Sequence, residues 1–226
     1  MPANILMIVT SHDRLGESNE KTGFWLEELA APYRVFAAAG AKIDIASPKG
    51  GKPPADPRSS EQPTEDVRWF LEDAEAVKKL ASTIPLAEAG DGYDAYFVVG
   101  GHGVMWDLAT DARAAKRLGS AFDRGKVVAA VCHGPAALVN VRTQDGKPLV
   151  EGRRVAGFSD EEEKAVKLDA VVPFPLETRL RELGGRYERG PIWSSFAVRD
   201  GRLVTGQNPQ SSAAVAHETL AALAAA

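Results

Sequence analysis

Short apolar runs alternate along the chain with longer stretches in which apolar residues recur every three or four positions. The short runs predict buried strands, and the longer stretches predict amphipathic helices that cover them. We predict strands at Ile5–Thr10, Lys42–Ser47, Ala95–Val99, Val127–Val131 and Leu203–Thr205, with Arg154–Phe158 as a sixth. We predict helices at Trp25–Ala39, Asp111–Asp123, Pro135–Val139, Leu176–Leu183 and Ser211–Ala225. This alternation indicates an α/β fold with a mostly parallel sheet, covered on both faces and binding its ligand at the carboxyl ends of the strands.

One segment, residues 48–89, departs from this pattern. It begins with a Gly- and Pro-rich stretch and continues as a charged stretch that contains Trp69, Phe70 and Leu71, with no strand pattern. We interpret it as an inserted cap or extended crossover within a single domain that spans residues 1–226. The segment could cover the site or pack on the edge of the sheet, and the sequence leaves both open.

The composition is that of a soluble, enzyme-sized domain. The chain has 226 residues, of which 44% are hydrophobic and 26% charged, so it can bury a large core. Its formal net charge of −4, with acidic and basic residues interleaved, excludes a nucleic-acid groove or a polybasic membrane surface. One cysteine excludes an intrachain disulfide and suits a reducing cytoplasm. The apolar start, Ile5–Thr10, is too short for a signal peptide or a membrane span.

The single cysteine, Cys132, stands where the β-branched run Val127–Val131 changes into helix-forming residues. A strand-to-helix turn exposes a side chain above the sheet and directs free N–H groups at it, which lowers a thiol pKa. A buried, inert cysteine is the alternative. We favour a nucleophile because His133 follows directly and Pro135 suits the first turn of a helix.

A glycine-rich turn, Gly100-Gly-His-Gly103, follows the strand predicted at Ala95–Val99. Glycines let the backbone turn sharply and present bare N–H groups to an anion. The N–H of Gly101 is a candidate for one half of an oxyanion hole, and the N–H of His133 for the other half. The run lacks the G-x-G-x-x-G spacing of a dinucleotide site.

Glu28 belongs to the segment Lys21–Pro32, just before or within the first predicted helix. If the helix runs through, Pro32 cannot donate to the carbonyl of Glu28 and the helix opens there. If Pro32 starts the helix instead, Glu28 lies in the preceding turn. Either geometry places Glu28 at an irregular point of the backbone, near the carboxyl edge of the sheet where the site is predicted. A solvated pair, Glu27 and Glu28, is the alternative that this segment taken alone favours.

Together these residues resemble the ThiJ/PfpI superfamily, specifically its glyoxalase III-like branch, which also contains heat-inducible chaperones. Five ordered blocks over nearly the whole chain carry the resemblance: Thr22-Gly23 with Glu28 and Pro32, Gly100–Gly103 with Trp106-Asp107, Ala129–Pro135, Gly157-Phe158 with the acidic residues after it, and Asp200–Pro209. The resemblance implies a flavodoxin-like three-layer sandwich with a nucleophile elbow, commonly a homodimer. It implies a Cys-His pair with a glutamate from the first helix region.

The implied activity is the conversion of methylglyoxal, a 2-oxoaldehyde, to D-lactate, as in a D-lactate dehydratase, without cofactor or metal. Cys132 is expected to attack the aldehyde, with the resulting oxygen held by the N–H groups of Gly101 and His133. Glu28, with a raised pKa, then moves protons through an enediol, while His133 acts on the thiol and on the hydrolytic water. Alignment on Gly157-Phe158 makes Glu163 the acidic partner of His133.

Two of these assignments stay open. Asp160, Glu161 and Glu162 lie beside Glu163, and such a charge run is usually a solvated face. His102 is expected either to bind a substrate oxygen or to shape its loop. His12 and His217 belong to no motif, and no His and carboxylate cluster has metal-ligand spacing.

Other functions remain as alternatives. A protein or nucleotide deglycase would use the same site, and a holdase chaperone would need exposed apolar surface around Trp69 and Phe70. A cysteine peptidase is less favoured because nothing specifies a peptide cleft. A glutamine amidotransferase is less favoured because its distal His-x-Glu pair is missing, since His217 and Glu218 are adjacent.

Overall fold

The five main predicted strands form the centre of a seven-stranded sheet with the order β3-β2-β1-β4-β5-β9-β8. The computed structural model describes residues 2–225. The central strands are β1 (Asn4–Ile8), β2 (Lys42–Ser47), β4 (Ala95–Val98), β5 (Val127–Val131) and β9 (Leu203–Gly206). The edges are the short β3 (Ile84–Pro85) and β8 (Ala197–Asp200), and β8 alone runs antiparallel to its neighbour. The α/β sandwich with a mostly parallel sheet is therefore confirmed.

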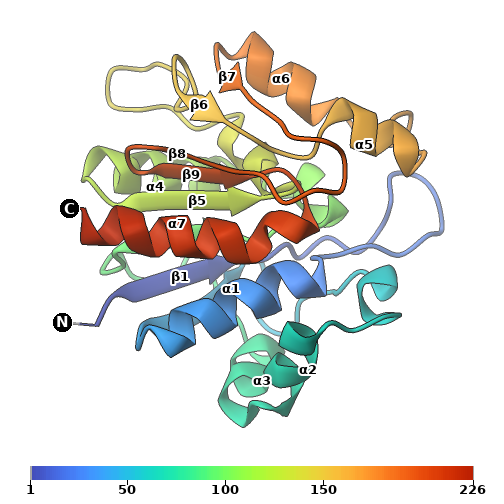
Figure 1. The fold of residues 1–226 in the computed structure, drawn as a ribbon, viewed down its shortest axis with the longest axis vertical. Coiled ribbons are helices and arrows are strands. Elements are labelled where there is room, and N and C mark those ends of the chain that lie inside the picture. The colour runs from blue at the N-terminus through green and yellow to red at the C-terminus, as the bar shows by residue number, and fades with distance from the viewer. Residues whose placement is uncertain (1, 226) are drawn as a thin grey trace.

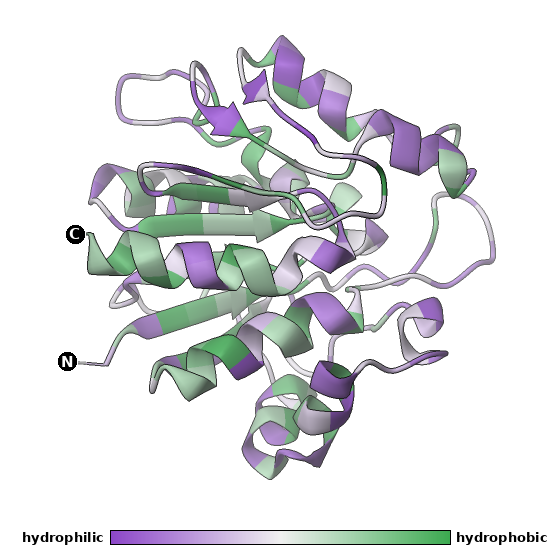
Figure 2. Ribbon diagram, viewed as in Figure 1, coloured by the Kyte–Doolittle hydropathy of each residue, from purple (hydrophilic) through white to green (hydrophobic). Residues whose placement is uncertain are grey.

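Helices cover both faces of this sheet (Figure 1). α1 (Leu26–Ala38) and α7 (Ser212–Ala224) pack side by side on one face, and α4 (Ala112–Asp123) lies on the other. Figure 2 shows the central strands in the green of hydrophobic residues, with purple gathered on the outer helices. β4 and β5 are buried along their whole length, as a sheet packed on two sides requires.

Residues 48–89 both contribute to the site and pack on the edge of the sheet, the two possibilities that the sequence left open. A 3-10 helix at Pro57–Ser60 and the loop after it line the cavity described below. α2 (Glu65–Glu72) and α3 (Ala74–Ala81) then pack beside α1 and β2, and β3 completes the sheet edge. Of the apolar surface that a holdase chaperone would need around Trp69 and Phe70, Leu71 is exposed and Trp69 is half-buried. Phe70 is fully buried and packs edge-on against Tyr33, with ring centroids 5.2 Å apart, because it faces α1.

The predicted sixth strand is also wrong as a member of the main sheet. Only β6 (Arg154–Val155) is extended, and it pairs with β7 (Arg186–Tyr187) in a separate ladder. The chain leaves β6 because the next residues are bonded elsewhere: the Ala156 N–H donates to Thr205 Oγ1 at 2.8 Å, and the Phe158 N–H donates to the Cys132 carbonyl at 2.8 Å. These bonds take the segment across the end of β5.

Two further helical expectations need correction. The helix expected at Pro135–Val139 is a 3-10 helix, Gly134–Leu138. A six-residue helix, α5 (Asp160–Ala165), was not predicted, because its acidic sequence has the pattern of a solvated loop. α6 (Leu176–Glu182) follows it as expected. Within residues 2–225, none of the helices combines the length and apolar character of a membrane span.

Candidate active site

Cys132 occupies a strained turn directly after β5. Its φ angle is 59°, in the left-handed region that residues other than glycine rarely adopt. Two hydrogen bonds hold this turn: the Cys132 N–H donates to the Gly206 carbonyl at 3.0 Å, and the Cys132 carbonyl accepts from Phe158. The strand-to-helix turn predicted from the sequence is therefore present, with its sulfur at the carboxyl edge of the sheet.

The imidazole of His133 links this thiol to a buried carboxylate. Cys132 Sγ lies 3.4 Å from His133 Nδ1, and His133 Nε2 lies 2.7 Å from Glu163 Oε2. The other oxygen, Glu163 Oε1, lies 2.8 Å from His102 Nε2. Glu163 therefore accepts an N–H from each ring. This arrangement fixes His133 as the tautomer whose Nδ1 lone pair faces the sulfur.

Electrostatics favour one protonation state for each of two groups of this site, Glu163 and His102. Burial would raise the pKa of Glu163, but the adjacent imidazoles of His133 and His102 outweigh burial and hold that pKa far below its usual range. Burial and the neighbouring His133 lower the pKa of His102 to about 4. At neutral pH the pair is therefore an ionised carboxylate and a neutral His102, which donates its Nε2–H.

Glu28 reaches the same sulfur from α1, and it is not the solvated residue that its own segment suggests. The helix runs through Pro32, and Glu28 is fully buried. Within residues 2–225, both of its carboxyl oxygens lack a hydrogen-bond partner. Burial raises the pKa of Glu28 well above its ordinary value, although Cys132 and the backbone of Gly100 partly offset that effect. Burial therefore favours the neutral, protonated form of the Glu28 carboxyl.

The thiol of Cys132 does not have the lowered pKa that the sequence suggested. Burial, and then the negative charge that an ionised Glu28 would carry, raise the pKa of Cys132 well above its ordinary value. The N–H of His133 acts in the opposite direction but is outweighed. The prediction of a lowered thiol pKa relied on a following helix, whereas only a short 3-10 helix follows and Cys132 is only 4% exposed. Attack by this thiol therefore needs a base to take its proton.

The two residues proposed to supply the oxyanion donors, Gly101 and His133, line the same cavity as Cys132. Gly101 begins the turn after β4 with a φ angle of 101°, and a Cβ at this position would collide with the backbone of residues 23–25. The turn thus requires glycine. Within residues 2–225, the N–H groups of Gly101 and His133 donate to no backbone carbonyl. Both are available to a developing negative charge.

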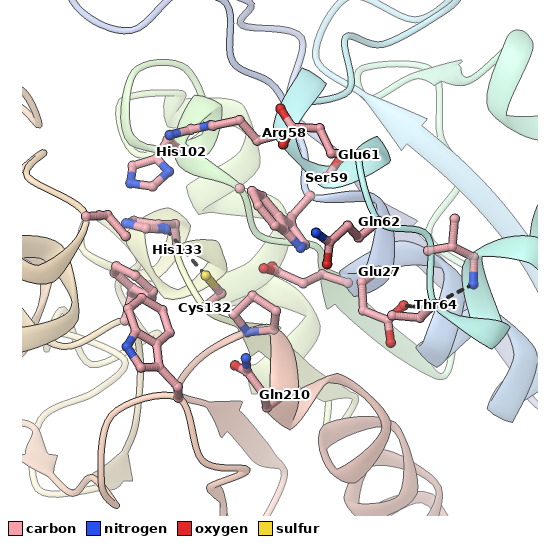
Figure 3. A pocket seen from close by; sticks show the side chains of 18 residues that line it. Glu27, Arg58, Ser59, Glu61, Gln62, Thr64, His102, Cys132, His133 and Gln210 are labelled. Carbon is pink, nitrogen blue, oxygen red and sulfur yellow. Dashed lines mark hydrogen bonds between the residues drawn. The ribbon is translucent and has the colours of Figure 1, made fainter.

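These groups open into one cavity of about 520 Å³ (Figure 3). Its inner part contains Cys132, His133, His102, Gly101 and Glu28, so the structure brings together five of the six residues singled out by the sequence. The sixth, Glu163, lies behind the two histidines. The remaining two histidines lie elsewhere: His12 stacks on Trp106, with ring centroids 5.3 Å apart, and His217 is exposed on α7.

A comparison with protein-family models finds a match over residues 21–222 to the model described as the DJ-1/PfpI family. The chain belongs to the DJ-1/PfpI family. The sequence resemblance to the ThiJ/PfpI superfamily is thereby confirmed.

Relatives within the DJ-1/PfpI family match over nearly the whole chain. Glyoxalase 3 of Candida albicans is 32% identical, over 96% of this chain and 97% of its own length. A crystal structure of glyoxalase III from Candida albicans superposes with a TM-score of 0.90 at 30% identity, covering 97% of both chains. The structure of the Rapid Encystment Protein 24 kDa of Francisella tularensis gives a TM-score of 0.94 at 39% identity, covering 99% of both chains.

Sequence reasoning missed one wall of this DJ-1/PfpI site. Trp193 lines the cavity with a φ angle of 59°, and its ring lies 5.8 Å from that of Phe158, which in turn packs 4.4 Å from His133. Trp193 stands in a loop without hydrophobic periodicity, so no signal in the sequence marked it. Trp193 and Phe158 make this wall apolar.

A buried carboxylate, Glu162, holds this wall in place. Glu162 Oε1 accepts from the N–H of Trp193 at 3.0 Å and from Asn208 Nδ2 at 2.8 Å. Its Oε2 accepts from the hydroxyl of Ser159 at 2.7 Å. Glu162 thus connects α5, the Trp193 loop and the segment after β9. In the acidic run that the sequence could not resolve, Glu162 secures the wall and Glu163 holds the two imidazoles.

His102, His133 and Glu163 also offer donor atoms that all lie within 4.8 Å of one another, a spacing that could hold a metal ion. The sequence analysis found no metal-ligand spacing, because His102, His133 and Glu163 lie far apart in the chain and only the fold brings them together. Both Nε2 atoms are engaged with the carboxylate, at 2.7 and 2.8 Å. A metal ion would have to displace those two hydrogen bonds.

Gly100→Ala is expected to damage both folding and the site. A Cβ at this position would collide with Glu28 Oε2 and with the carbonyl of Val131, neither of which can move freely in the packed interior. We expect a loss of about 1–3 kcal/mol in the free energy of unfolding, measured by urea denaturation. Gly90→Ala is the matched control, because a Cβ there meets no atom within 4 Å. Equal stability of the two variants would contradict the close packing around Glu28.

Proposed function

We propose that this protein is a glutathione-independent glyoxalase that converts methylglyoxal and water to D-lactate with no cofactor, the reaction of a D-lactate dehydratase. The observation that carries the proposal is the combination, in one cavity, of a thiol facing an imidazole that a carboxylate orients and a fully buried carboxyl without a hydrogen-bond partner. The names of the Candida albicans relatives support the same activity.

The first step joins the sulfur to the aldehyde. His133 Nδ1 takes the proton of Cys132 as the sulfur attacks C1 of methylglyoxal. The N–H groups of Gly101 and His133 hold the oxygen that becomes negative, and Glu28 protonates it. The products are a hemithioacetal, an ionised Glu28 and a protonated His133. Glu163 stabilises the imidazolium through its 2.7 Å contact with Nε2.

The second step moves hydrogen from C1 to C2. Ionised Glu28, a strong base because its pKa is raised, takes the C1 proton, while protonated His133 gives its proton to the C2 oxygen. The resulting enediol collapses when Glu28 returns the proton to C2 and His133 takes the proton of the C1 hydroxyl. C1 is now a thioester and C2 a secondary alcohol. Because Glu28 reaches one face of the planar enediol, a single enantiomer forms.

Water completes the cycle. Ionised Glu28 takes a proton from the water that attacks the thioester, and protonated His133 returns a proton to the departing sulfur of Cys132. This proton count assigns activation of the water to Glu28 rather than to His133, which already holds a proton at this stage. One methylglyoxal and one water give one lactic acid, and all three side chains return to their starting states.

The decisive test measures both lactate enantiomers formed by the reduced protein from methylglyoxal. The assay contains no glutathione and includes a metal chelator, and it uses dehydrogenases specific for D- and L-lactate. We expect D-lactate in amounts equal to the methylglyoxal consumed. Consumption without D-lactate, or formation of L-lactate, would exclude the proposed function.

Glu163→Gln is expected to lower kcat for methylglyoxal by about 100-fold or more. An amide in place of the carboxylate neither fixes the His133 tautomer nor stabilises the imidazolium. The matched control is Glu161→Gln, two positions earlier on α5, where the carboxylate is exposed and contacts Arg189 at 2.6 Å. We expect the control to keep its activity, as measured by D-lactate formation. An active Glu163→Gln protein would remove Glu163 from the mechanism.

A further inference from the structure

The cavity is larger than methylglyoxal requires, and this observation leads to a wider substrate class for the proposed glyoxalase. Methylglyoxal has about as many non-hydrogen atoms as five waters, which occupy about 150 Å³ in the liquid. The cavity measures about 520 Å³ and lies within the range of sites for much larger ligands. Most of its volume therefore lies beyond the reach of a three-carbon substrate bound at Cys132.

The outer part of the cavity offers hydrogen-bonding groups to a ligand. Gln62 and Gln210 line this part and are exposed, so neither side-chain amide is enclosed by the protein and both can reach a ligand. Figure 3 shows the two glutamines on the side of the sulfur away from His102 and His133. Each amide can both donate and accept, which matches the hydroxyl group of a ligand.

The charges around this outer part argue against an anionic ligand. Arg58 is the cationic residue of the lining, but its guanidinium is paired with the buried carboxylate of Asp56, at 2.9 and 2.7 Å. The carboxylates of Glu27 and Glu61 also line the cavity. A phosphate or carboxylate on the substrate would meet these acids with no unpaired cation to offset them.

We propose that the outer part of the cavity, defined by Gln62 and Gln210, binds the neutral polyhydroxyl chain of sugar-derived 2-oxoaldehydes. The reaction at Cys132 is the one already described: C1 is oxidised from aldehyde to carboxylic acid, C2 is reduced from ketone to alcohol, and one water is added. Substrates of this class arise when a reducing sugar, or its adduct with an amine, eliminates water next to its carbonyl group. The protein would then act on products of sugar breakdown as well as on methylglyoxal.

The test compares 3-deoxyglucosone, a six-carbon neutral 2-oxoaldehyde, with methylglyoxal. The proteins are the unmodified chain, the double variant Gln62→Ala/Gln210→Ala, and Gln144→Ala, in which an exposed glutamine far from the cavity is removed as a control. The readouts are KM for each substrate and the ratio of kcat/KM for 3-deoxyglucosone to kcat/KM for methylglyoxal. A third substrate, the phosphate ester of hydroxypyruvaldehyde, tests charge.

We expect a lower KM for 3-deoxyglucosone than for methylglyoxal in the unmodified chain, because the longer substrate makes more contacts. The double variant is expected to lower the kcat/KM ratio about tenfold, as the loss of two hydrogen bonds would do, while the control leaves the ratio unchanged. The phosphate ester should be at least about tenfold poorer than 3-deoxyglucosone.

The proposal is overturned if 3-deoxyglucosone is not converted, if the double variant leaves the ratio unchanged, or if the phosphate ester is the better substrate. This inference rests on the proposed function, and the two fail differently. A protein that forms no D-lactate from methylglyoxal contradicts the glyoxalase assignment itself. A protein that converts methylglyoxal but meets one of the three conditions above contradicts only the wider substrate class.

Discussion

Cys132→Ala is expected to lower kcat/KM for methylglyoxal by at least about 1000-fold, measured as D-lactate formation. The proposed mechanism forms its only covalent bond to substrate through this sulfur, and within residues 2–225 the cavity lining contains no second thiol. Cys132→Ser should be similarly inactive, because a serine hydroxyl is far less acidic than a thiol and His133 would have to deprotonate it. D-lactate formation by either variant above a few per cent of the original rate would exclude covalent catalysis by Cys132.

The same position allows a stability control that separates chemistry from folding. With φ at 59°, Cys132 and an alanine in its place are both strained, whereas glycine adopts this angle freely. We therefore expect Cys132→Gly to be about 1 kcal/mol more stable than Cys132→Ala in urea denaturation, with both inactive. If the glycine variant is the less stable of the two, the turn is not strained as described.

Glu28→Gln is expected to reduce kcat for methylglyoxal by about 100- to 10,000-fold, because an amide cannot accept and return the proton that moves between C1 and C2. Its size and shape are nearly those of the original side chain, so the cavity should persist. Glu161→Gln again serves as the matched exchange of a carboxylate for an amide, at an exposed site. Activity of Glu28→Gln close to that of this control would assign the proton transfer to another group.

The same substitution should change how stability depends on pH. Because the pKa of Glu28 is raised in the folded state, the folded chain keeps a proton that the unfolded chain releases above pH about 4.5. The free energy of unfolding of the original protein therefore falls as pH rises above this value, by at most about 1.4 kcal/mol per pH unit, until the folded-state pKa is reached. Glu28→Gln has no carboxyl at this position and so does not lose stability in this way. The melting temperature of Glu28→Gln minus that of the original protein should therefore increase between pH 5 and pH 8. Parallel pH profiles would contradict a neutral, buried Glu28.

The centre of the fold could be predicted from the sequence because its signals are local. Buried parallel strands need continuous apolar runs, and β2 and β5 have the predicted bounds. The turn at Cys132 follows from the end of such a run. Glu28 is a different case, since its burial depends on the approach of Gly100, a residue far away in the chain. For Glu28, the family resemblance supplied what the local pattern could not.

The missed features depend on tertiary contacts. The acidic run of α5 is typical of a solvated surface, yet Glu162 and Glu163 are buried because Asn208, Trp193 and two histidines from other loops satisfy their oxygens. β8 is a short edge strand with exposed positions, and its four residues carry little hydrophobic signal. The thiol pKa was misjudged for the same reason, since desolvation by distant segments determines it.

The adjacency of Glu162 and Glu163 on α5 limits how a protein with this site can evolve. Glu162 fixes the apolar wall of the cavity, and Glu163 orients the His133 imidazole that faces the thiol. A backbone shift of this one short helix moves both carboxylates together. The width of the cavity and the orientation of the imidazole are therefore inherited together: a lineage that repositions α5 to widen the cavity also disturbs the hydrogen bond that orients His133.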